Sequence, residues 1–178
     1  MRRDQLEHIV RASAEITGES EVLVFGSQAI LCSYDDADLP VEAIGSIEAD
    51  VTFFADDTRE KADAVTGAIG ELSLFHETYG VYADGVEIGT ATLPPDWRQR
   101  AVLFDTPMTK PGRAVCLEPH DLAASKLVAF RDKDLRFVRA LIAEGMLDVG
   151  LLARRVEALP IDDDVRSRLL DWLGERSS

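Results

Sequence analysis

The segment from residue 47 to residue 54 constrains the fold most, because apolar and polar side chains alternate along it. The apolar set is Ile47, Ala49, Val51 and Phe53, and the residues between them are Glu48, Asp50 and Thr52. A β-strand has a side-chain period of two, so the pattern predicts a strand with one buried face and two carboxylates on the other. Two neighbouring carboxylates repel each other. Either their face is open to water, or a cation lies between them.

Hydrophobic periodicity and turn residues predict the other elements. We expect helices at 3–17, after Gly26-Ser27, at 58–72, 121–145, 148–158 and 162–174, strands at 21–25, 101–105 and 113–117, and a loop at 35–45. Asp84-Gly85, between two β-like runs, predicts a hairpin turn. Acids at 56 and 57 and at 121 are expected to cap helices, and Gly18 and Gly145 to end them. The fold class is α+β: a mixed sheet packed by helices over 1–118, then a helical segment over 119–178.

Composition limits the classes of partner. The chain has 178 residues and a formal net charge of -14, which disfavours broad DNA binding and binding to an anionic membrane. No apolar run approaches the roughly 20 residues of a membrane span, and no signal peptide is recognisable, so a cytoplasmic protein is expected. Cys32 and Cys116 are 84 positions apart without a C-x-x-C motif, which predicts buried thiols and not a disulfide or a zinc site.

Gly26-Ser27, at the end of a predicted strand, is the first candidate site. Backbone N–H groups at a strand-to-helix turn form an anion site suited to phosphate, and glycine allows close approach. The alternative is a simple turn in which Ser27 caps the helix.

Acidic residues form the second candidate site. Glu48 and Asp50 on one strand face are suitable ligands for Mg²⁺, and Glu87, on the return strand of the predicted hairpin, is a candidate third carboxylate. The alternative is that all three acids are solvent-exposed surface residues.

A locally basic stretch runs from Lys126 to Arg139. It carries five cations and two acids, and Lys126 and Asp134 lie eight residues apart, close to one helix face. A lysine there is suited to contact nucleotide phosphates, and the stretch is suited to an RNA acceptor such as a tRNA end. The alternative is a solvated helix surface with ion pairs such as Arg131–Asp134.

The order of these motifs carries a resemblance. VFGSQAIL followed by IEADVTFF resembles the Gly-Ser and Asp-x-Asp motifs of the nucleotidyltransferase superfamily with a polymerase-β-like core, with Glu48 in place of the first aspartate. DLAASKLVAFRDKDLRFVRAL looks like the helical motif of the AbiEii-type (MenT-like) members. Together with LPPDWRQR it is closer still to a bacterial family of predicted nucleotidyltransferases without assigned function. The resemblance covers roughly residues 20–145.

The resemblance implies roles for particular residues. Gly26 and Ser27 would bind a triphosphate, Glu48 and Asp50 would hold Mg²⁺ or Mn²⁺ with Glu87 as third carboxylate, Lys126 and Arg131 would contact phosphates, and Asp134 would be a polar active-site residue. The implied reaction moves an NMP from an NTP to a hydroxyl acceptor on an RNA or tRNA end, a protein or a small molecule.

Three alternatives remain open at this point. The fold could bind an NTP without turnover. The chain could be a toxin–antitoxin component with a cognate protein partner. It could also be a structural α+β module in which the acid pair is surface.

Overall fold

Five strands form one mixed sheet in the order β3-β2-β1-β5-β4. A computed structural model describes residues 1–175 of the chain. The strands are β1 (Glu21–Val24), β2 (Glu48–Thr52), β3 (Tyr82–Gly85), β4 (Val102–Phe104) and β5 (Arg113–Cys116). β1 is parallel to β5 and antiparallel to β2, β2 is parallel to β3, and β4 is antiparallel to β5. The predicted α+β class and mixed sheet are confirmed.

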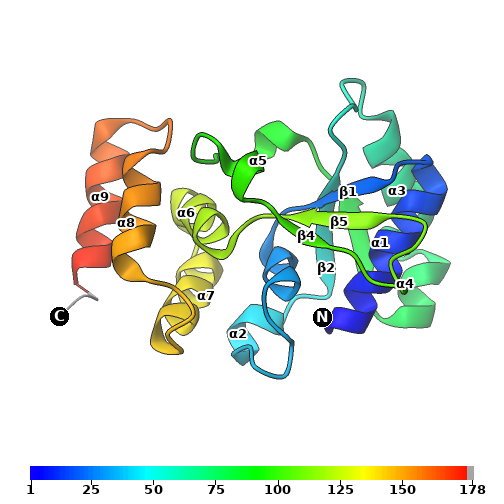
Figure 1. The fold of residues 1–178 in the computed structure, drawn as a ribbon, viewed down its shortest axis with the longest axis horizontal. Coiled ribbons are helices and arrows are strands. Elements are labelled where there is room, and N and C mark those ends of the chain that lie inside the picture. The colour runs from blue at the N-terminus through cyan, green and yellow to red at the C-terminus, as the bar shows by residue number, and fades with distance from the viewer. Residues whose placement is uncertain (176–178) are drawn as a thin grey trace.

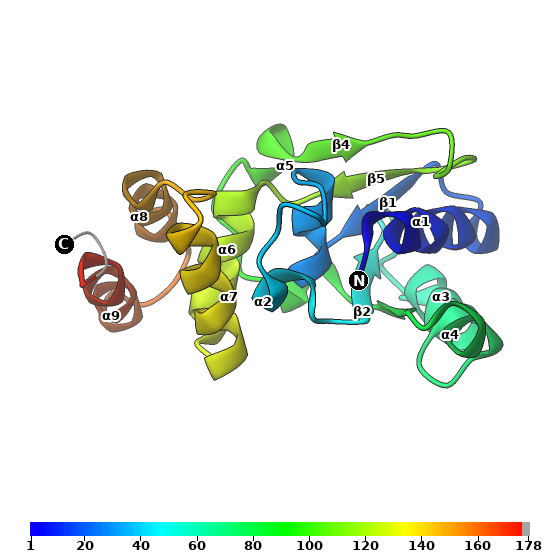
Figure 2. The same ribbon diagram turned by 90° about the horizontal axis from the view of Figure 1, so that it is seen from below.

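Most of the longer helices lie at the two ends of the molecule (Figures 1 and 2). α1, α3 and α4 lie at one side, and α6 to α9 lie at the opposite end of the molecule. The helices are α1 (Arg3–Thr17), η1 (Ser27–Cys32, 3₁₀), α2 (Val41–Ile44), α3 (Glu60–Ile69), α4 (Leu74–Tyr79), η2 (Ile88–Thr90, 3₁₀), α5 (Trp97–Arg100), α6 (Pro119–Ala129), α7 (Asp132–Ala143), α8 (Val149–Glu157) and α9 (Asp163–Gly174). Among residues 1–175, no helix combines the length and apolar character that a membrane crossing requires.

Several predicted helix boundaries are confirmed. α1 ends at Gly18, whose φ is 72° and whose N–H donates to the Ala14 carbonyl. Asp56 accepts the backbone N–H groups of Lys61 and Ala62 at the start of α3, at 3.0 and 2.8 Å. Gly145 follows α7 with a φ of 69°, which is the left-handed conformation that commonly ends a helix.

One predicted helix ends early and is followed by α4, which was not predicted, and another predicted helix is divided in two. The helix expected at 58–72 ends at Gly70, and α4 begins after Ser73, whose hydroxyl accepts the His76 N–H. The helix expected at 121–145 breaks at Phe130, which has a φ of 51°. Helix propensity did not predict the helix ends at Gly70 and Phe130, because no proline lies at either position.

Asp121 does not cap α6. Glu118 does so instead, accepting the N–H groups of His120 and Asp121. The Asp121 side chain is fully buried and pairs with Arg100 Nε at 2.8 Å and with Arg155 Nε at 2.9 Å. A buried carboxylate needs such partners, and here they connect α6 to α5 and α8.

The predicted hairpin at Asp84-Gly85 is wrong. Both residues belong to β3, which pairs in parallel with β2. Gly85 has no positive φ, which a type I′ turn would require. A Cβ on Gly85 would lie 2.0 Å from the Ala62 carbonyl oxygen. Glycine is therefore needed here for close packing of α3 on the strand, and not for a turn.

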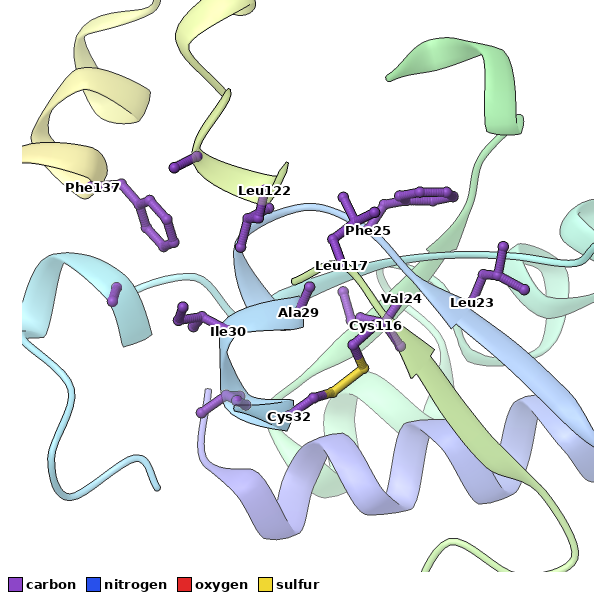
Figure 3. Close-up of a cluster of buried hydrophobic side chains, with 14 of the residues drawn as sticks. Leu23, Val24, Phe25, Ala29, Ile30, Cys32, Cys116, Leu117, Leu122 and Phe137 are labelled. Atoms are coloured by element: carbon purple, nitrogen blue, oxygen red, sulfur yellow. A yellow bond between two sulfur atoms is a disulfide. The ribbon is translucent and has the colours of Figure 1, made fainter. Parts of the chain in front are cut away.

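One cluster of buried apolar side chains includes residues from both sides of the junction at 118–119. Figure 3 shows Leu122 of α6 close to Ala29 of η1. The same view shows a disulfide between Cys32 and Cys116, with an S–S distance of 2.03 Å. The prediction of two free thiols is therefore wrong. The separation in sequence concealed the pairing, because η1 follows β1 and β1 lies beside β5.

Candidate active site

The acid-bearing face of β2 is formed as the alternation predicted. Ala49, Val51 and Phe53 are buried on one face, at most 2% exposed. Glu48 and Asp50 are only partly buried on the other face, and Thr52 follows them in the same row. Ile47 departs from the pattern at 46% exposure, because the strand begins one residue later.

β3 brings a third carboxylate to this row. Parallel pairing places Asp84 opposite Asp50 and Tyr82 opposite Glu48, and neighbouring strands are separated by about 4.8 Å. The Tyr82 hydroxyl donates to Glu48 Oε2 at 3.4 Å. No residue in 1–175 donates a hydrogen bond to the carboxylates of Asp50 or Asp84. Asp84 is the residue that sequence reasoning missed, since Asp-Gly indicated a turn.

Gly26, which follows β1, lies against the carboxylate of Asp50. Its φ is 62° and its ψ is -167°, a conformation that essentially only glycine adopts. A Cβ at this position would lie 2.0 Å from Asp50 Oδ2. The backbone N–H of Phe25 donates to the Asp50 carbonyl at 2.9 Å. The Gly-Ser turn and the acid pair, 24 residues apart in sequence, therefore meet in one place.

Burial and mutual repulsion raise the pKa of both acids on β2. Burial raises the pKa of Asp50, an effect that the charge of Lys126 opposes and that of Asp84 reinforces. The pKa of Glu48 is raised by burial and then by the charges of Asp50 and Asp84. Burial, together with the nearby Glu48, raises the pKa of the Tyr82 hydroxyl to about 12. The site thus holds excess negative charge that a cation would stabilise.

A buried ion pair lies across from the acids. Lys126 Nζ lies 3.3 Å from Asp134 Oδ1, and Arg131 Nε lies 2.6 Å from Asp134 Oδ2. Lys126 Nζ also stands 4.9 Å from the centre of the Phe137 ring. Burial lowers the pKa of Lys126. Burial alone would raise the pKa of Asp134, but the hydrogen bond from Arg131 and the charge of Lys126 outweigh it, so that this pKa is lowered.

A cleft of about 350 Å³ lies between Asp50 and Lys126. Gly26, Asp50, Lys126 and Arg131 line it, with Ser125 among its polar residues. Its apolar lining consists of Phe25, Val86, Ala91, Leu117, Leu122, Val128 and Ala129. The Asp50 carboxylate thus faces cations across a partly apolar space, an arrangement suited to a molecule with a polyanionic part and a flat apolar part.

Four predicted residues do not line this cleft: Ser27, Glu48, Glu87 and Asp134. Ser27 begins η1 and is not among the residues that line the cleft. Glu87 lies beyond the end of β3, where its side chain is 57% exposed and pairs with Arg59 at 3.1 Å. Lys133 was not predicted as a site residue. Its positive charge nevertheless acts on the site, because it lowers the pKa values of Glu48 and Asp50 and so counteracts part of the effect of burial.

A glycine turn closing on an acidic strand, with a buried lysine opposite, is the arrangement that the resemblance to nucleotidyltransferases implies. The family described as "Nucleotidyltransferase of unknown function (DUF6036)" matches residues 4–173, and the chain belongs to this family. No curated protein and no solved structure matches the chain. The superfamily resemblance of the motifs is thereby confirmed, and the match covers the C-terminal helices as well as the sheet.

Proposed function

We propose that this protein is a nucleotidyltransferase that moves an NMP from an NTP to a hydroxyl group. One observation carries the proposal: the Asp50 carboxylate is partly buried beside Asp84, accepts no hydrogen bond from residues 1–175, and lies against Gly26. A carboxylate in this position is costly for stability unless a ligand compensates for it. A divalent cation with a bound triphosphate is such a ligand.

The residues fit a divalent cation by their chemistry. Carboxylate oxygens are the ligands that Mg²⁺ prefers, with water and substrate phosphate completing its shell. Glu48, Asp50 and Asp84 would hold it, with Asp84 taking the role that the sequence suggested for Glu87. In residues 1–175, no group of three or more His, Cys, Asp or Glu side chains already converges as a metal site, so side chains must rotate on binding. When bound, the cation neutralises charge on the triphosphate and on these acids.

The chain's own groups support each part of the transfer. The acceptor oxygen forms a bond to the α-phosphorus, the bond from the α-phosphorus to pyrophosphate breaks, and a carboxylate oxygen of Asp84 takes the acceptor proton. Lys126 and Arg131 offset the charge of the departing pyrophosphate. Gly26 allows the Asp50 carboxylate to lie directly against the backbone at the cleft, because a side chain there would collide with the carboxylate.

Labelled nucleotide transfer tests the proposal. Wild-type protein is incubated with Mg²⁺, each of four α-labelled NTPs and a pool of cell-derived acceptors, beside Asp50→Asn and the exposed control Asp38→Asn. We expect transfer by wild type and by the control, and a loss of at least about 100-fold in Asp50→Asn. Transfer by Asp50→Asn at the wild-type rate would rule out this site.

A second candidate function is NTP binding without turnover. The hydrogen bond from Tyr82 to Glu48 favours it, since it occupies one oxygen of the residue that replaces the usual first aspartate. Under this function, wild type binds an NTP with Mg²⁺ and transfers nothing to any acceptor. Tyr82→Phe separates the two functions. If the protein is an enzyme, the variant is expected to transfer NMP at the wild-type rate or faster. If the protein only binds NTP, neither wild type nor the variant transfers NMP.

A further inference from the structure

A second cavity, of about 250 Å³, lies next to the cleft along β2. Thr52, Phe54, Asp57, Arg59 and Glu87 line it, and Val86 lines both cavities. Asp50 faces the cleft, and Thr52 follows it two residues later in the same row. Two residues of a strand span roughly 6.5–7 Å, so a molecule in the second cavity has Asp50 within a short reach.

Thr52 indicates that the second cavity takes a polar ligand. The residue is only 3% exposed. Its hydroxyl has no hydrogen-bond partner among residues 1–175. The hydroxyl oxygen is not among the fully enclosed side-chain atoms that lack a partner, so it is open to the cavity that Thr52 lines, and a partner can come from that space. A ligand hydroxyl would supply both a donor and an acceptor.

The charges around the cavity indicate a cationic ligand. Asp56, Asp57 and Glu87 face Arg59 among the lining residues, and Arg98 lies over the ring of Phe54, which leaves one negative charge in excess around the cavity. Asp56 is occupied by the N–H groups of α3, and Glu87 is paired with Arg59. The Asp57 carboxylate is exposed and has no partner in residues 1–175, so it is free to pair with an incoming ammonium group.

The remaining lining is apolar. Phe54 is 37% exposed, and the guanidinium of Arg98 stands 4.9 Å from the centre of its ring. Val86 and Ile88 complete this side of the cavity. An apolar wall beside a free carboxylate suits a small organic body that carries an amine.

We propose that the second cavity is the acceptor subsite, and that the acceptor is a small organic cation bearing the hydroxyl group that receives the NMP. This inference rests on the proposed function. The ammonium group pairs with Asp57, the apolar part of the body lies on Phe54 and Val86, and a hydroxyl passes Thr52 toward Asp50.

The distribution of cations on α7 supports a small acceptor over an RNA. Arg131 is held by Asp134, and the guanidinium of Arg139 stands 5.4 Å from the centre of the Trp172 ring. Lys133 and Arg136 remain as exposed cations of this helix. Two such charges on a chain of net charge -14 are few for a polyanion that is bound through many phosphate contacts.

Amide NMR mapping of the full chain tests the inference. The probes are 2-aminoethanol and glucosamine, their uncharged counterparts ethylene glycol and N-acetylglucosamine, and a single-stranded RNA oligonucleotide. The protein variants are Asp57→Asn, Thr52→Val and the control Asp38→Asn. Each sample is also titrated with the four NTPs and Mg²⁺, so that binding in the cleft is measured separately.

We expect the cationic probes to shift the amides of Thr52, Val86 and Ile88, and to bind at least tenfold more tightly than their uncharged counterparts. Asp57→Asn and Thr52→Val should each weaken this binding at least threefold and leave Mg²⁺–NTP binding unchanged, and Asp38→Asn should change neither. The inference is overturned if NTP shifts the cleft and no cationic probe shifts the second cavity, or if RNA alone binds, through Lys133 and Arg136. If neither NTP nor any probe binds, the proposed function fails as well.

Discussion

At Gly26 the backbone runs against the Asp50 carboxylate with a φ of 62°. A methyl group there would need the space that Asp50 Oδ2 occupies, 2.0 Å away. The residue thus has two separate requirements, one for its own backbone conformation and one for its neighbour. A double-mutant cycle separates them.

We predict that Gly26→Ala lowers the free energy of unfolding by at least about 2 kcal/mol. In an Asp50→Ala background the loss should be smaller by about 1 kcal/mol, because the colliding carboxylate is gone. Urea denaturation of the four proteins measures both values. Equal losses in the two backgrounds would mean that Gly26 and Asp50 do not interact.

Asp50 gives a prediction about pH. Because burial raises its folded pKa above the unfolded value, its stabilising contribution is present below the unfolded pKa and is lost as pH rises through the folded pKa. Asp50→Asn should therefore be more stable than wild type at pH 8, by about 1 kcal/mol or 2–4 °C in Tm. The difference should shrink toward pH 4. Thermal denaturation monitored by circular dichroism at several pH values tests this, and a variant less stable than wild type at pH 8 contradicts it.

At the scale of elements, the break at Phe130 places the cations. α6 ends in a left-handed residue and α7 begins at Asp132. The turn brings Asp134 of α7 to Lys126 of α6, and Asp134 is only 1% exposed. The pair therefore joins two helices, whereas the sequence suggested two positions on one helix face.

Asp134→Asn is expected to lower the free energy of unfolding by about 3 kcal/mol, because Lys126 loses its charge partner in a buried setting. Arg131→Gln is the comparison: its side chain is 61% exposed and its loss leaves the Lys126–Asp134 pair in place, so it should cost less than Asp134→Asn. Urea denaturation compares the two variants. A loss in Asp134→Asn no larger than in Arg131→Gln would show that Lys126 does not depend on Asp134.

Sequence patterns predicted some elements well and others poorly, for physical reasons. The period of β2 gave Glu48 and Asp50 on one face, because a half-buried strand must alternate. β3 repeats that alternation, with Val81, Ala83 and Gly85 buried and Tyr82 and Asp84 only partly so. This signal could have identified Asp84. It was hidden because Asp-Gly is also the commonest hairpin signal, and because close packing by α3 cannot be read from a single glycine.

At the scale of the molecule, the cleft combines residues from distant parts of the chain. Asp50 comes from β2 and lies beside Asp84 of β3, and Lys126 and Arg131 come from α6 and the turn that follows it. The motif order in the sequence predicted this meeting for Gly26, Asp50 and Lys126. The position of Glu87 and the disulfide between Cys32 and Cys116 depend on strand order, which local patterns do not determine.

The charge of the whole molecule opposes the binding of an anionic NTP, since the chain carries a formal charge of -14. Local cations counteract this at the cleft, where the charges of Lys126, Arg131 and Lys133 all reach Asp50. Such focusing raises the local concentration of an anionic ligand. NTP binding should still be weak without a divalent cation, because Glu48, Asp50 and Asp84 would repel the triphosphate.

Thermal denaturation with each of four NTPs, with and without Mg²⁺, tests this coupling on wild type, Asp50→Asn and Asp84→Asn. A ligand at 100 times its Kd adds about 2.7 kcal/mol to the free energy of unfolding, or roughly 5–10 °C in Tm for a chain of this size. We predict such a rise in wild type with at least one NTP only when Mg²⁺ is present, and little or none in either variant. An equal rise in all three proteins, or no rise in wild type with any NTP, would contradict the account.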